Sequence, residues 1–571
     1  MLKLLTFAFL LAAHCSLFAQ STPEIEKEKA IRRAKMIEQA VAETPQLRLP
    51  ENRAVIFSKL GAVVAKDPER SRSFFQNAIA ELIAAQSFAE QNRKASNQQS
   101  DLLTSQSTRP QILNQIAQYD AEFALESLYK TRPSAIERAL TNKTQGKIGD
   151  FQNNSNYLAQ AEVGLEQRLI GMVAQQKPER SVALLKDSIN KKVSGETLNL
   201  LKKLFEKDPA AANELGNEVI GKLVGKGFMS GTQPNYESIS LANSILTEFI
   251  RERNPNEKYI AFEESRVRDL AEKLIAVYIA KGPQLGYIPL QQLEPIVKRF
   301  SPASYEALKT AAANTRYRGH YRESDPELQK LMQNDPTAGF LIAEAKKFPA
   351  ESRPSIYQAA ANKLSESGQY DQALGVLKDH FEDDALENAV NSLNWTYSQQ
   401  LINKGNYDAA ESLILSFVEA NKNSALISLA LTIFNANPDE NRSRSVGILN
   451  RVRSSMPDQP ENSNDMSQLF QLVSTYASID PSEAFRNLEP AVEQMNELAN
   501  AFAVVNAFQG NNVRQGEFVI SNGYNFGIYI DSSMFRTLAE KDFGRTMDLI
   551  DGFSRREMRL MIRVQLLESG L

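Results

Sequence analysis

The 571-residue chain is expected to be an all-α protein, a right-handed-type α-solenoid (superhelix) of stacked helical hairpins. Three observations predict this class. Apolar residues recur at three- and four-residue steps along most of the chain, which is the period of one helix face. Asp-Pro steps recur between these segments, and one longer pattern returns after 37 residues. The composition, 42% hydrophobic and 23% charged, is typical of a folded protein.

The repeating unit is clearest in residues 196–227, "ETLNLLKKLFEKDPAAANELGNEVIGKLVGKG". Leu201 and Leu204 belong to the apolar face of a first helix. Asp208 is a strong N-cap for the next helix, because its carboxylate accepts free backbone N–H groups of the first turn. Pro209 suits the first helical position, where a missing N–H has no cost. A second apolar set and a glycine-rich end follow, so the segment predicts a helix, a tight turn and a helix.

The same Asp-Pro device occurs along the chain. It stands at Asp67-Pro68, Asp325-Pro326, Asp335-Pro336 and Asp480-Pro481, with Lys177-Pro178 as a variant. Twelve residues after the Asp or Lys, an aliphatic residue recurs at Ile79, Ile189, Ile220 and Val492. Asp335 departs from this register, because Lys347 stands at that distance. A single hairpin cannot bury its apolar face alone, so hairpins stacked into a continuous core are expected.

A second repeat pairs residues 364–377, "LSESGQYDQALGVL", with residues 401–414, "LINKGNYDAAESLI". The matching residues are Gly368 and Gly405, Tyr370 and Tyr407, Asp371 and Asp408, and Ala373 and Ala410. This pattern resembles the junction between the two helices of a tetratricopeptide repeat. The resemblance implies that glycine ends the first helix, the aromatic ring packs on the turn and the alanine allows close approach. It covers residues 360–421, and departs from the family in its longer period, its missing Trp and its missing closing Pro.

These signals divide the chain as follows. We expect a signal peptide at 1–19, an N-terminal helical region at 20–110, divergent hairpins at 111–350, tetratricopeptide-like repeats at 351–455 and a C-terminal helical region at 466–571. Interruptions at 86–110, 225–238 and 454–465 are expected to be long loops or boundaries, and 225–238 is a glycine-rich connection. Residues 516–530 are rich in β-branched and aromatic residues around Asn522-Gly523. They predict an extended loop or a small β-hairpin, and the extended loop is preferred.

The first residues predict export. Lys3, an apolar run over 4–13 and a short region ending at Ala19 form the three parts of a secretory signal peptide. Lipidation of Cys15 is disfavoured, because the bulky His14 precedes it where lipoproteins carry a small residue. A periplasmic or secreted chain without cysteine is therefore expected. No later stretch is long and apolar enough to predict a transmembrane helix.

The motif search favours a protein without catalytic, metal or cofactor sites. His320 and His380 are isolated, and no phosphate-binding, dinucleotide-binding, zinc or calcium motif occurs in the sequence. The acidic run at 381–387 is interpreted as a solvated helix start. The mildly acidic net charge of −4 gives no general attraction for nucleic acid.

Two basic clusters remain. The stretch "NTRYRGHYRE" offers weak binding candidates: Arg316, Arg318, His320, Tyr321 and Arg322. Arginine forks among aromatic rings suit phosphate, carboxylate or glycan groups, although a packed connection with paired arginines is the preferred interpretation. Near the C-terminus, Arg555, Arg559 and Arg563 follow at four-residue steps. They are expected to form a solvated helix face.

The expected function is an exported, non-catalytic scaffold that binds an unidentified protein or peptide of the cell envelope. Stacked helical repeats expose long surfaces suited to that role. The alternative is an envelope glycan-binding protein or enzyme that uses a groove of the superhelix around residues 316–322.

Overall fold

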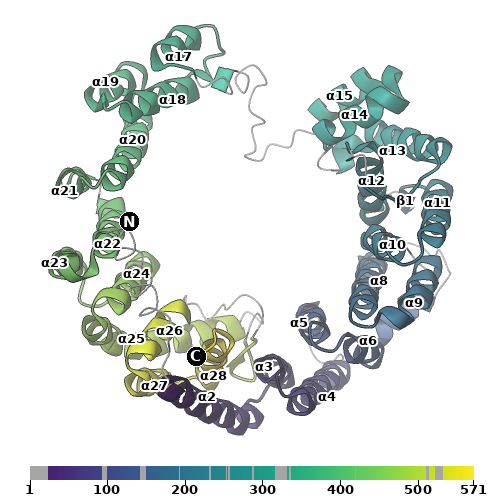
Figure 1. Ribbon diagram of the computed structural model, residues 1–571, viewed down its shortest axis with the longest axis horizontal. Coiled ribbons are helices and arrows are strands. Elements are labelled where there is room, and N and C mark those ends of the chain that lie inside the picture. Colours follow the sequence, from purple (N-terminus) through teal and green to yellow (C-terminus); the bar gives the residue numbers. More distant parts are fainter. Residues whose placement is uncertain are drawn as a thin grey trace, which may run out of the picture. The chain divides into compact units, whose positions relative to one another are not determined.

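The computed structural model describes residues 23–92, 99–141, 150–191, 193–230, 233–252, 254, 257–285, 288–314, 331–332, 336–417, 419–508, 513–520 and 532–571. These residues contain 26 α-helices and two very short β-hairpins (Figure 1). They divide into two compact units. Of the described residues, unit 1 contains those within 23–40, 331–518 and 532–571, and unit 2 contains those within 41–314 and 519–520. The predicted all-α solenoid of helical repeats is confirmed within each unit.

Unit 2 is a two-layered stack of helices. Its helices are α3 (Pro50–Val63), α4 (Pro68–Asn92), α5 (Gln99–Ala117), α6 (Ala121–Lys130), α7 (Ser134–Thr141), α8 (Asp150–Gln176), α9 (Pro178–Lys191), α10 (Thr197–Phe205), α11 (Pro209–Lys226), α12 (Tyr236–Ile250), α13 (Glu264–Leu285), α14 (Leu290–Phe300) and α15 (Tyr305–Asn314). Two 3-10 turns, η1 (Thr44–Gln46) and η2 (Pro302–Ser304), and the strands β1 (Met229–Ser230) and β2 (Gln233–Pro234) complete it. Helices α3, α5, α8, α10, α12 and α14 contact one another in succession, and α9, α11, α13 and α15 do the same in the second layer.

Unit 1 continues the pattern of hairpins. It holds most of α2 (Pro23–Glu43), and then α17 (Ala338–Ala345), α18 (Arg353–Glu366), α19 (Tyr370–His380), α20 (Asp383–Asn403), α21 (Tyr407–Leu415), α22 (Glu419–Ala436), α23 (Pro438–Ser455), α24 (Ser463–Ile479), α25 (Pro481–Phe508), α26 (Ser532–Lys541), α27 (Phe543–Asp551) and α28 (Arg556–Glu568). Successive hairpins pair α18 with α19, α20 with α21, α22 with α23 and α24 with α25. The first helix of one hairpin contacts the first helix of another where α18 meets α20 and α22 meets α24. None of the described helices of either unit is long and apolar enough to cross a membrane.

Three of the Asp-Pro steps are helix starts, as predicted. Helix α4 begins at Pro68, and the Asp67 carboxylate accepts a hydrogen bond from the Arg70 amide at 3.1 Å. Helix α11 begins at Pro209, and Asp208 accepts from the Ala211 amide at 3.0 Å. Helix α25 likewise begins at Pro481, directly after Asp480. The aliphatic residues twelve positions after each Asp or Lys, namely Ile79, Ile189, Ile220 and Val492, are all buried.

One Asp-Pro step behaves differently. Helix α17 begins at Ala338, two residues beyond Pro336, and its cap is Thr337, whose hydroxyl accepts from the Phe340 amide at 3.4 Å. The expected start at Pro336 is therefore wrong. Thr337 offers a competing N-cap closer to the apolar residues that α17 buries. The remaining step, Asp325-Pro326, lies outside the described residues.

The two tetratricopeptide-like junctions have the same backbone geometry. Gly368 and Gly405 end α18 and α20 with φ of +80° and +73°. After each glycine, the next N–H reaches the carbonyl oxygen five residues earlier, at 2.8 and 2.9 Å. This is a Schellman cap, in which glycine takes the left-handed conformation without a Cβ penalty. Ala373 and Ala410 are fully buried at the following helix contacts.

Two of the expected loops need revision. Residues 86–110 are largely helical where described, because α4 runs to Asn92 and α5 starts at Gln99. Their polar composition is misleading, since Thr108 and Arg109 are themselves buried. Residues 225–238 include the end of α11, the β1–β2 hairpin and the start of α12. The expected loop at 454–465 does separate α23 from α24, over residues 456–462.

The second β-hairpin lies at the start of the segment expected to be non-helical. Strands β3 (Val513–Arg514) and β4 (Glu517–Phe518) pair antiparallel, with Arg514 opposite Glu517. The two turn residues, Gln515 and Gly516, have φ of +51° and +75°. A positive φ at both central residues is the signature of a type I′ turn. The hairpin therefore turns at 515–516, whereas Asn522-Gly523 lies outside the described residues.

Candidate interaction surface

The cluster proposed from the sequence lies outside the described residues: Arg316, Arg318, His320, Tyr321 and Arg322. His380 is described. It is exposed at the end of α19 and stacks on the Tyr357 ring, with centroids 3.7 Å apart. This is a packing contact. Within the residues that the structure describes, no group of three or more His, Cys, Asp and Glu side chains is placed to hold a metal ion.

The C-terminal arginine stripe is not the solvated face that was expected. Arg563 is only 2% exposed and forms an ion pair with Asp551. Arg559 donates to the carbonyl oxygen of Phe553 at 2.6 Å, and Arg555 lies 4.7 Å from the centre of the Phe518 ring. Helix α28 is covered on most sides, so its arginines turn back onto nearby carbonyl oxygens, an acid and a ring. The stripe stabilises the last helices.

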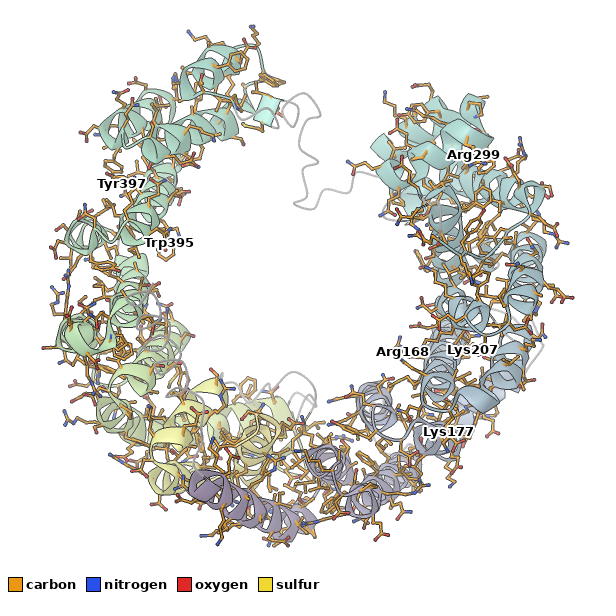
Figure 2. All side chains as sticks on the ribbon, viewed as in Figure 1. Arg168, Lys177, Lys207, Arg299, Trp395 and Tyr397 are labelled. Atoms are coloured by element: carbon orange, nitrogen blue, oxygen red, sulfur yellow. The ribbon has the colours of Figure 1, made fainter. Side chains whose placement is uncertain are left out.

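Several surface cations of unit 2 are paired with acids. Arg168 of α8 lies 2.8 Å from Glu196, next to the start of α10, and Lys202 of α10 lies 2.7 Å from Glu248 of α12. Arg299 of α14 lies 3.2 Å from Glu264 of α13. Arg168 and Arg299 are labelled in Figure 2. These pairs tie successive helices together and place an acid beside each of the three cations.

A buried charge network joins α5 to α8 in unit 2. The Arg109 guanidinium donates to both oxygens of the Glu162 carboxylate, at 2.7 and 2.9 Å, and the Arg132 Nε donates to the same carboxylate at 2.9 Å. Burial alone would raise the Glu162 pKa, but hydrogen bonds and charge from the two arginines outweigh it and hold the pKa below its ordinary range. Arg109 and Glu162 are both buried and paired. The network is a structural tie between α5 and α8.

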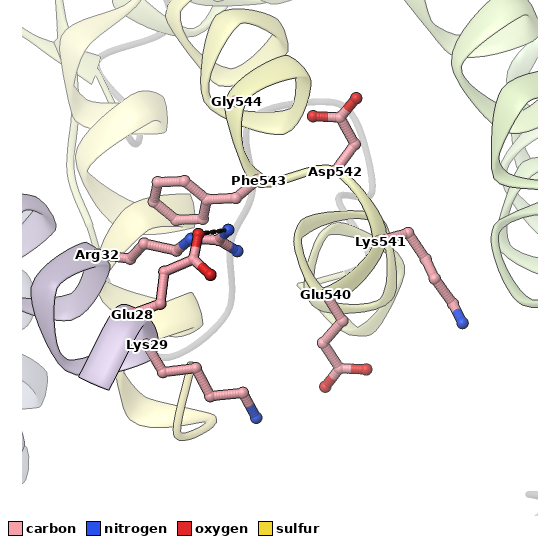
Figure 3. Close-up of a pocket in the computed structure, with 8 residues that line it drawn as sticks. All are labelled: Glu28, Lys29, Arg32, Glu540, Lys541, Asp542, Phe543 and Gly544. Carbon is pink, nitrogen blue, oxygen red and sulfur yellow. Dashed lines mark hydrogen bonds and ion pairs between the residues drawn. The ribbon is translucent and has the colours of Figure 1, made fainter. Parts of the chain in front are cut away.

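A pocket of about 430 Å³ lies within unit 1, between α2 and the α26–α27 turn. Glu28, Lys29, Arg32, Glu540, Lys541, Asp542, Phe543 and Gly544 line it (Figure 3). Arg32 forms an ion pair with Glu28, and its guanidinium lies 5.2 Å from the centre of the Phe543 ring. Asp542 caps α27 by accepting from the Arg545 amide at 3.0 Å. The lining has three acidic and three basic side chains, so it has no net charge. Arg32 and Phe543 pack against each other, and Asp542 caps a helix.

Helix α20 presents a different kind of surface. Asn388, Ser392, Trp395 and Gln399 follow at steps of four, three and four residues, which places them on one helix face. Trp395 is the only tryptophan of the chain, and it is 43% exposed. Figure 2 shows Trp395 and Tyr397 on opposite sides of α20. Tyr397 packs inward, with its ring stacked on Tyr370 at 4.6 Å.

The neighbouring packing holds this part of α20 in place. The Tyr370 hydroxyl, at the start of α19, donates to the Asn394 side chain. Ser398 is buried too, and its hydroxyl bonds within α20 to the carbonyl oxygen of Trp395 at 2.7 Å. Leu393 is fully buried beneath them. The Tyr370 contact and the burial of Leu393 therefore hold α20 on sides of the helix away from Trp395, whose indole remains exposed.

The repeat extends the same surface onto α18. The 37-residue offset relates Ser355, Gln358 and Asn362 to Ser392, Trp395 and Gln399. Helix α18 contacts α20. We call these six residues together with Asn388 the Trp395 face. The face contains one aromatic ring, amides and hydroxyls, and it contains no charged side chain.

Comparisons with known proteins identify no family for this chain. No family model and no curated protein matches the sequence. Among solved structures, one match is described as a circular tandem repeat protein with novel repeat topology and enhanced subunit contact surfaces. It is 14% identical and covers 95% of this chain and 100% of its own, with a TM-score of 0.16. That score is too low to establish a shared fold, so nothing about this chain is inferred from the match.

The chemistry of the Trp395 face suits recognition. An indole gives a large, rigid apolar surface with one N–H donor, and amide side chains both donate and accept hydrogen bonds. Side chains of this kind can meet a peptide backbone, whereas none of the seven is an acid, a base or a cysteine. This surface was not predicted from the sequence. The signal was present, because Trp395 stands where the equivalent residue one repeat earlier is Gln358.

Proposed function

We propose that this chain is an exported, non-catalytic helical-repeat scaffold that binds a protein or peptide of the cell envelope through the Trp395 face. The observation that carries the proposal is the placement of the chain's single tryptophan on an exposed, uncharged surface of two stacked repeats. Helical-repeat stacks typically bind through such extended surfaces.

The composition of the Trp395 face supports a protein partner. The centres of protein interfaces are enriched in aromatic residues and depleted in charge, and tryptophan is among the commonest residues that dominate binding energy. Because a tryptophan side chain has only two rotatable torsions, it loses little conformational entropy when a partner covers it. The partner is expected to offer an apolar side chain to the Trp395 indole and main-chain or amide groups to Gln358 and Asn362.

The support for export is the signal-peptide pattern of residues 1–19 and nothing else. The test is the mass of the chain recovered from the periplasm or the medium of its source cells. Recovery of a chain that begins after Ala19 supports export, and an uncut chain found with the cytoplasmic fraction contradicts it.

The partner can be sought by site-specific crosslinking in the envelope fraction. A photoreactive amino acid in place of Gln358 should capture it. The control places the same group at Glu387, which is exposed roughly two turns before Trp395 on α20 and does not belong to the Trp395 face. The partner is then expressed and titrated into the full chain while tryptophan emission is recorded. When the partner lacks tryptophan, the emission comes from Trp395 alone, so a blue shift with saturation reports coverage of this face.

Two variants decide the outcome. Trp395→Ala should weaken partner binding, measured by calorimetry, by at least about tenfold, because truncating an anchor residue of this kind costs more than about 1.4 kcal/mol. Glu387→Ala should leave affinity unchanged. Equal affinity of wild type and Trp395→Ala would place the binding site elsewhere. Turnover of an envelope substrate by the purified chain would contradict the non-catalytic role.

A further inference from the structure

Helix α25 carries apolar side chains on two faces, and only one of these faces is packed by those residues of unit 1 that the structure describes. Met495, Ala499 and Ala503 are buried on the packed face. Phe502 also contributes there, with its ring 6.0 Å from that of Phe518. These contacts hold the C-terminal half of α25 against its own unit. A helix that is apolar all round is normally covered all round.

The second face of α25 is open. Leu498, Ala501, Val505 and Phe508 follow at steps of three, four and three residues, with Val504 beside them. Phe508 is 94% exposed, Val504 71%, Val505 53% and Leu498 43%. Steps of three and four are the spacing by which one helix packs along another. We call these five residues the α25 seam.

The charge beside the α25 seam is entirely negative along this helix. Between residues 487 and 508 the sequence has three glutamates and neither lysine nor arginine. Glu489 is paired with Arg545 at 2.6 Å. Glu493 and Glu497 are exposed, and their four-residue spacing places them on the Val504 side of the seam. A helix that lies on the seam therefore meets carboxylates along one edge.

We propose that the α25 seam binds an amphipathic helix of another protein, with apolar residues at three- and four-residue steps and lysine or arginine beside them. The apolar stripe matches the seam, and the basic residues match Glu493 and Glu497, which is how flanking charges select partners in helix pairs. A second copy of this seam would bring only further glutamates, so the observed charge favours a different protein. The α25 seam is separate from the Trp395 face.

The test uses the full chain and two labelled peptides of about three heptads each. Both carry leucine at the seam positions, one has lysine at the flanking positions and the other has glutamate there. Fluorescence anisotropy should show saturable binding of the lysine peptide and at least about tenfold weaker binding of the glutamate peptide. Raising the salt concentration from about 0.01 M to about 1 M should reduce the difference in affinity between the two peptides, because salt screens the flanking charges.

Matched variants locate the site. Phe508→Ala and Val504→Ser should each weaken binding of the lysine peptide by at least about tenfold. Phe340→Ala is the control, because Phe340 is also exposed, on α17. Trp395→Ala should leave peptide binding unchanged, which separates this proposal from the function proposed for the Trp395 face. Circular dichroism checks that every variant remains helical.

Three results would overturn the proposal. One is the absence of lysine-peptide binding to wild-type protein, or binding that survives Phe508→Ala. A second is equal affinity for the two peptides across the salt range. The third is a wild-type dimer in light scattering that Phe508→Ala converts to a monomer, because a second copy would then be the occupant of the α25 seam.

Discussion

Arg33 donates a hydrogen bond from its guanidinium to the carbonyl oxygen of Leu567 at 2.7 Å, although the two residues are 534 positions apart. The same nitrogen lies 3.3 Å from the carbonyl oxygen of Leu571. Carbonyl groups in the last turn of a helix have no partner within it, and a cation there also meets the negative end of the helix dipole. Burial lowers the Arg33 pKa from its ordinary value. The first described helix is thus part of the packing that ends unit 1.

The first prediction concerns this contact. Arg33→Ala should lower the opening free energy of α28 by about 2 kcal/mol, because hydrogen bonds to charged groups contribute about 1.5–3 kcal/mol. Native-state hydrogen exchange of α28 amides measures that local stability directly. Lys35→Ala, at an exposed position of the same helix, is the control and should leave exchange unchanged. Unchanged α28 protection in Arg33→Ala would show that the contact does not stabilise this end.

The second prediction separates backbone strain from side-chain space. An added Cβ meets no atom within 4 Å at either Gly368 or Gly375. Gly368 has φ of +80°, whereas Gly375 lies inside α19. Gly368→Ala should therefore destabilise unit 1 by about 1 kcal/mol, and Gly375→Ala should stabilise it by about 0.5–1 kcal/mol. Urea unfolding followed by circular dichroism measures both. Two changes of the same sign would contradict the assigned cap geometry.

Sequence patterns predict this fold where a few neighbouring residues decide the local structure. Asp67 and Asp208 cap helices because capping needs only the next few residues, and the glycine of a Schellman cap is equally local. Arg563 shows the limit. Its spacing describes one face of a helix, and no local pattern reveals that other elements cover that face too.

The same limit applies to long-range contacts and to the two proposed binding surfaces. Arg33 and Leu567 meet across almost the whole chain, which no local period can show. To predict the Trp395 face from the sequence, one needs the 37-residue offset and must also know which side of α20 is packed. Exposure of Phe508 depends on which face of α25 its own unit uses. A stripe of apolar residues looks the same in sequence whether it is covered or open.

The third prediction concerns Asp67 as a helix cap. Asp67→Ala should cost about 1 kcal/mol of unfolding free energy, because the Arg70 amide loses its acceptor at the start of α4. Partner binding should be unaffected. Glu69→Ala changes an exposed carboxylate in the same turn and should cost less. Thermal unfolding and the partner titration test both statements. Loss of binding by a fully folded Asp67→Ala protein would refute a role limited to capping α4.

The fourth prediction concerns Glu162 and pH. Glu162→Gln should destabilise unit 2 by about 3–5 kcal/mol at neutral pH, because the buried Arg109 and the partly buried Arg132 lose the charge that compensates them. The pKa of Glu162 is lowered in the folded protein from its ordinary value of 4.5. A carboxylate whose folded pKa is depressed stabilises the fold fully above the unfolded pKa, and this stability is lost as pH falls through the folded pKa.

The stability difference between wild type and Glu162→Gln should therefore be constant above about pH 5.5 and should shrink as the pH falls below 4.5. Denaturant unfolding of both proteins at a series of pH values measures it. Glu137→Gln, at an exposed position of α7, is the control and should show little difference at any pH. A difference between wild type and Glu162→Gln that grows on acidification would require a raised Glu162 pKa. The effect of burial on the Glu162 pKa would then exceed the effect of the two arginines, and the network would destabilise the folded protein.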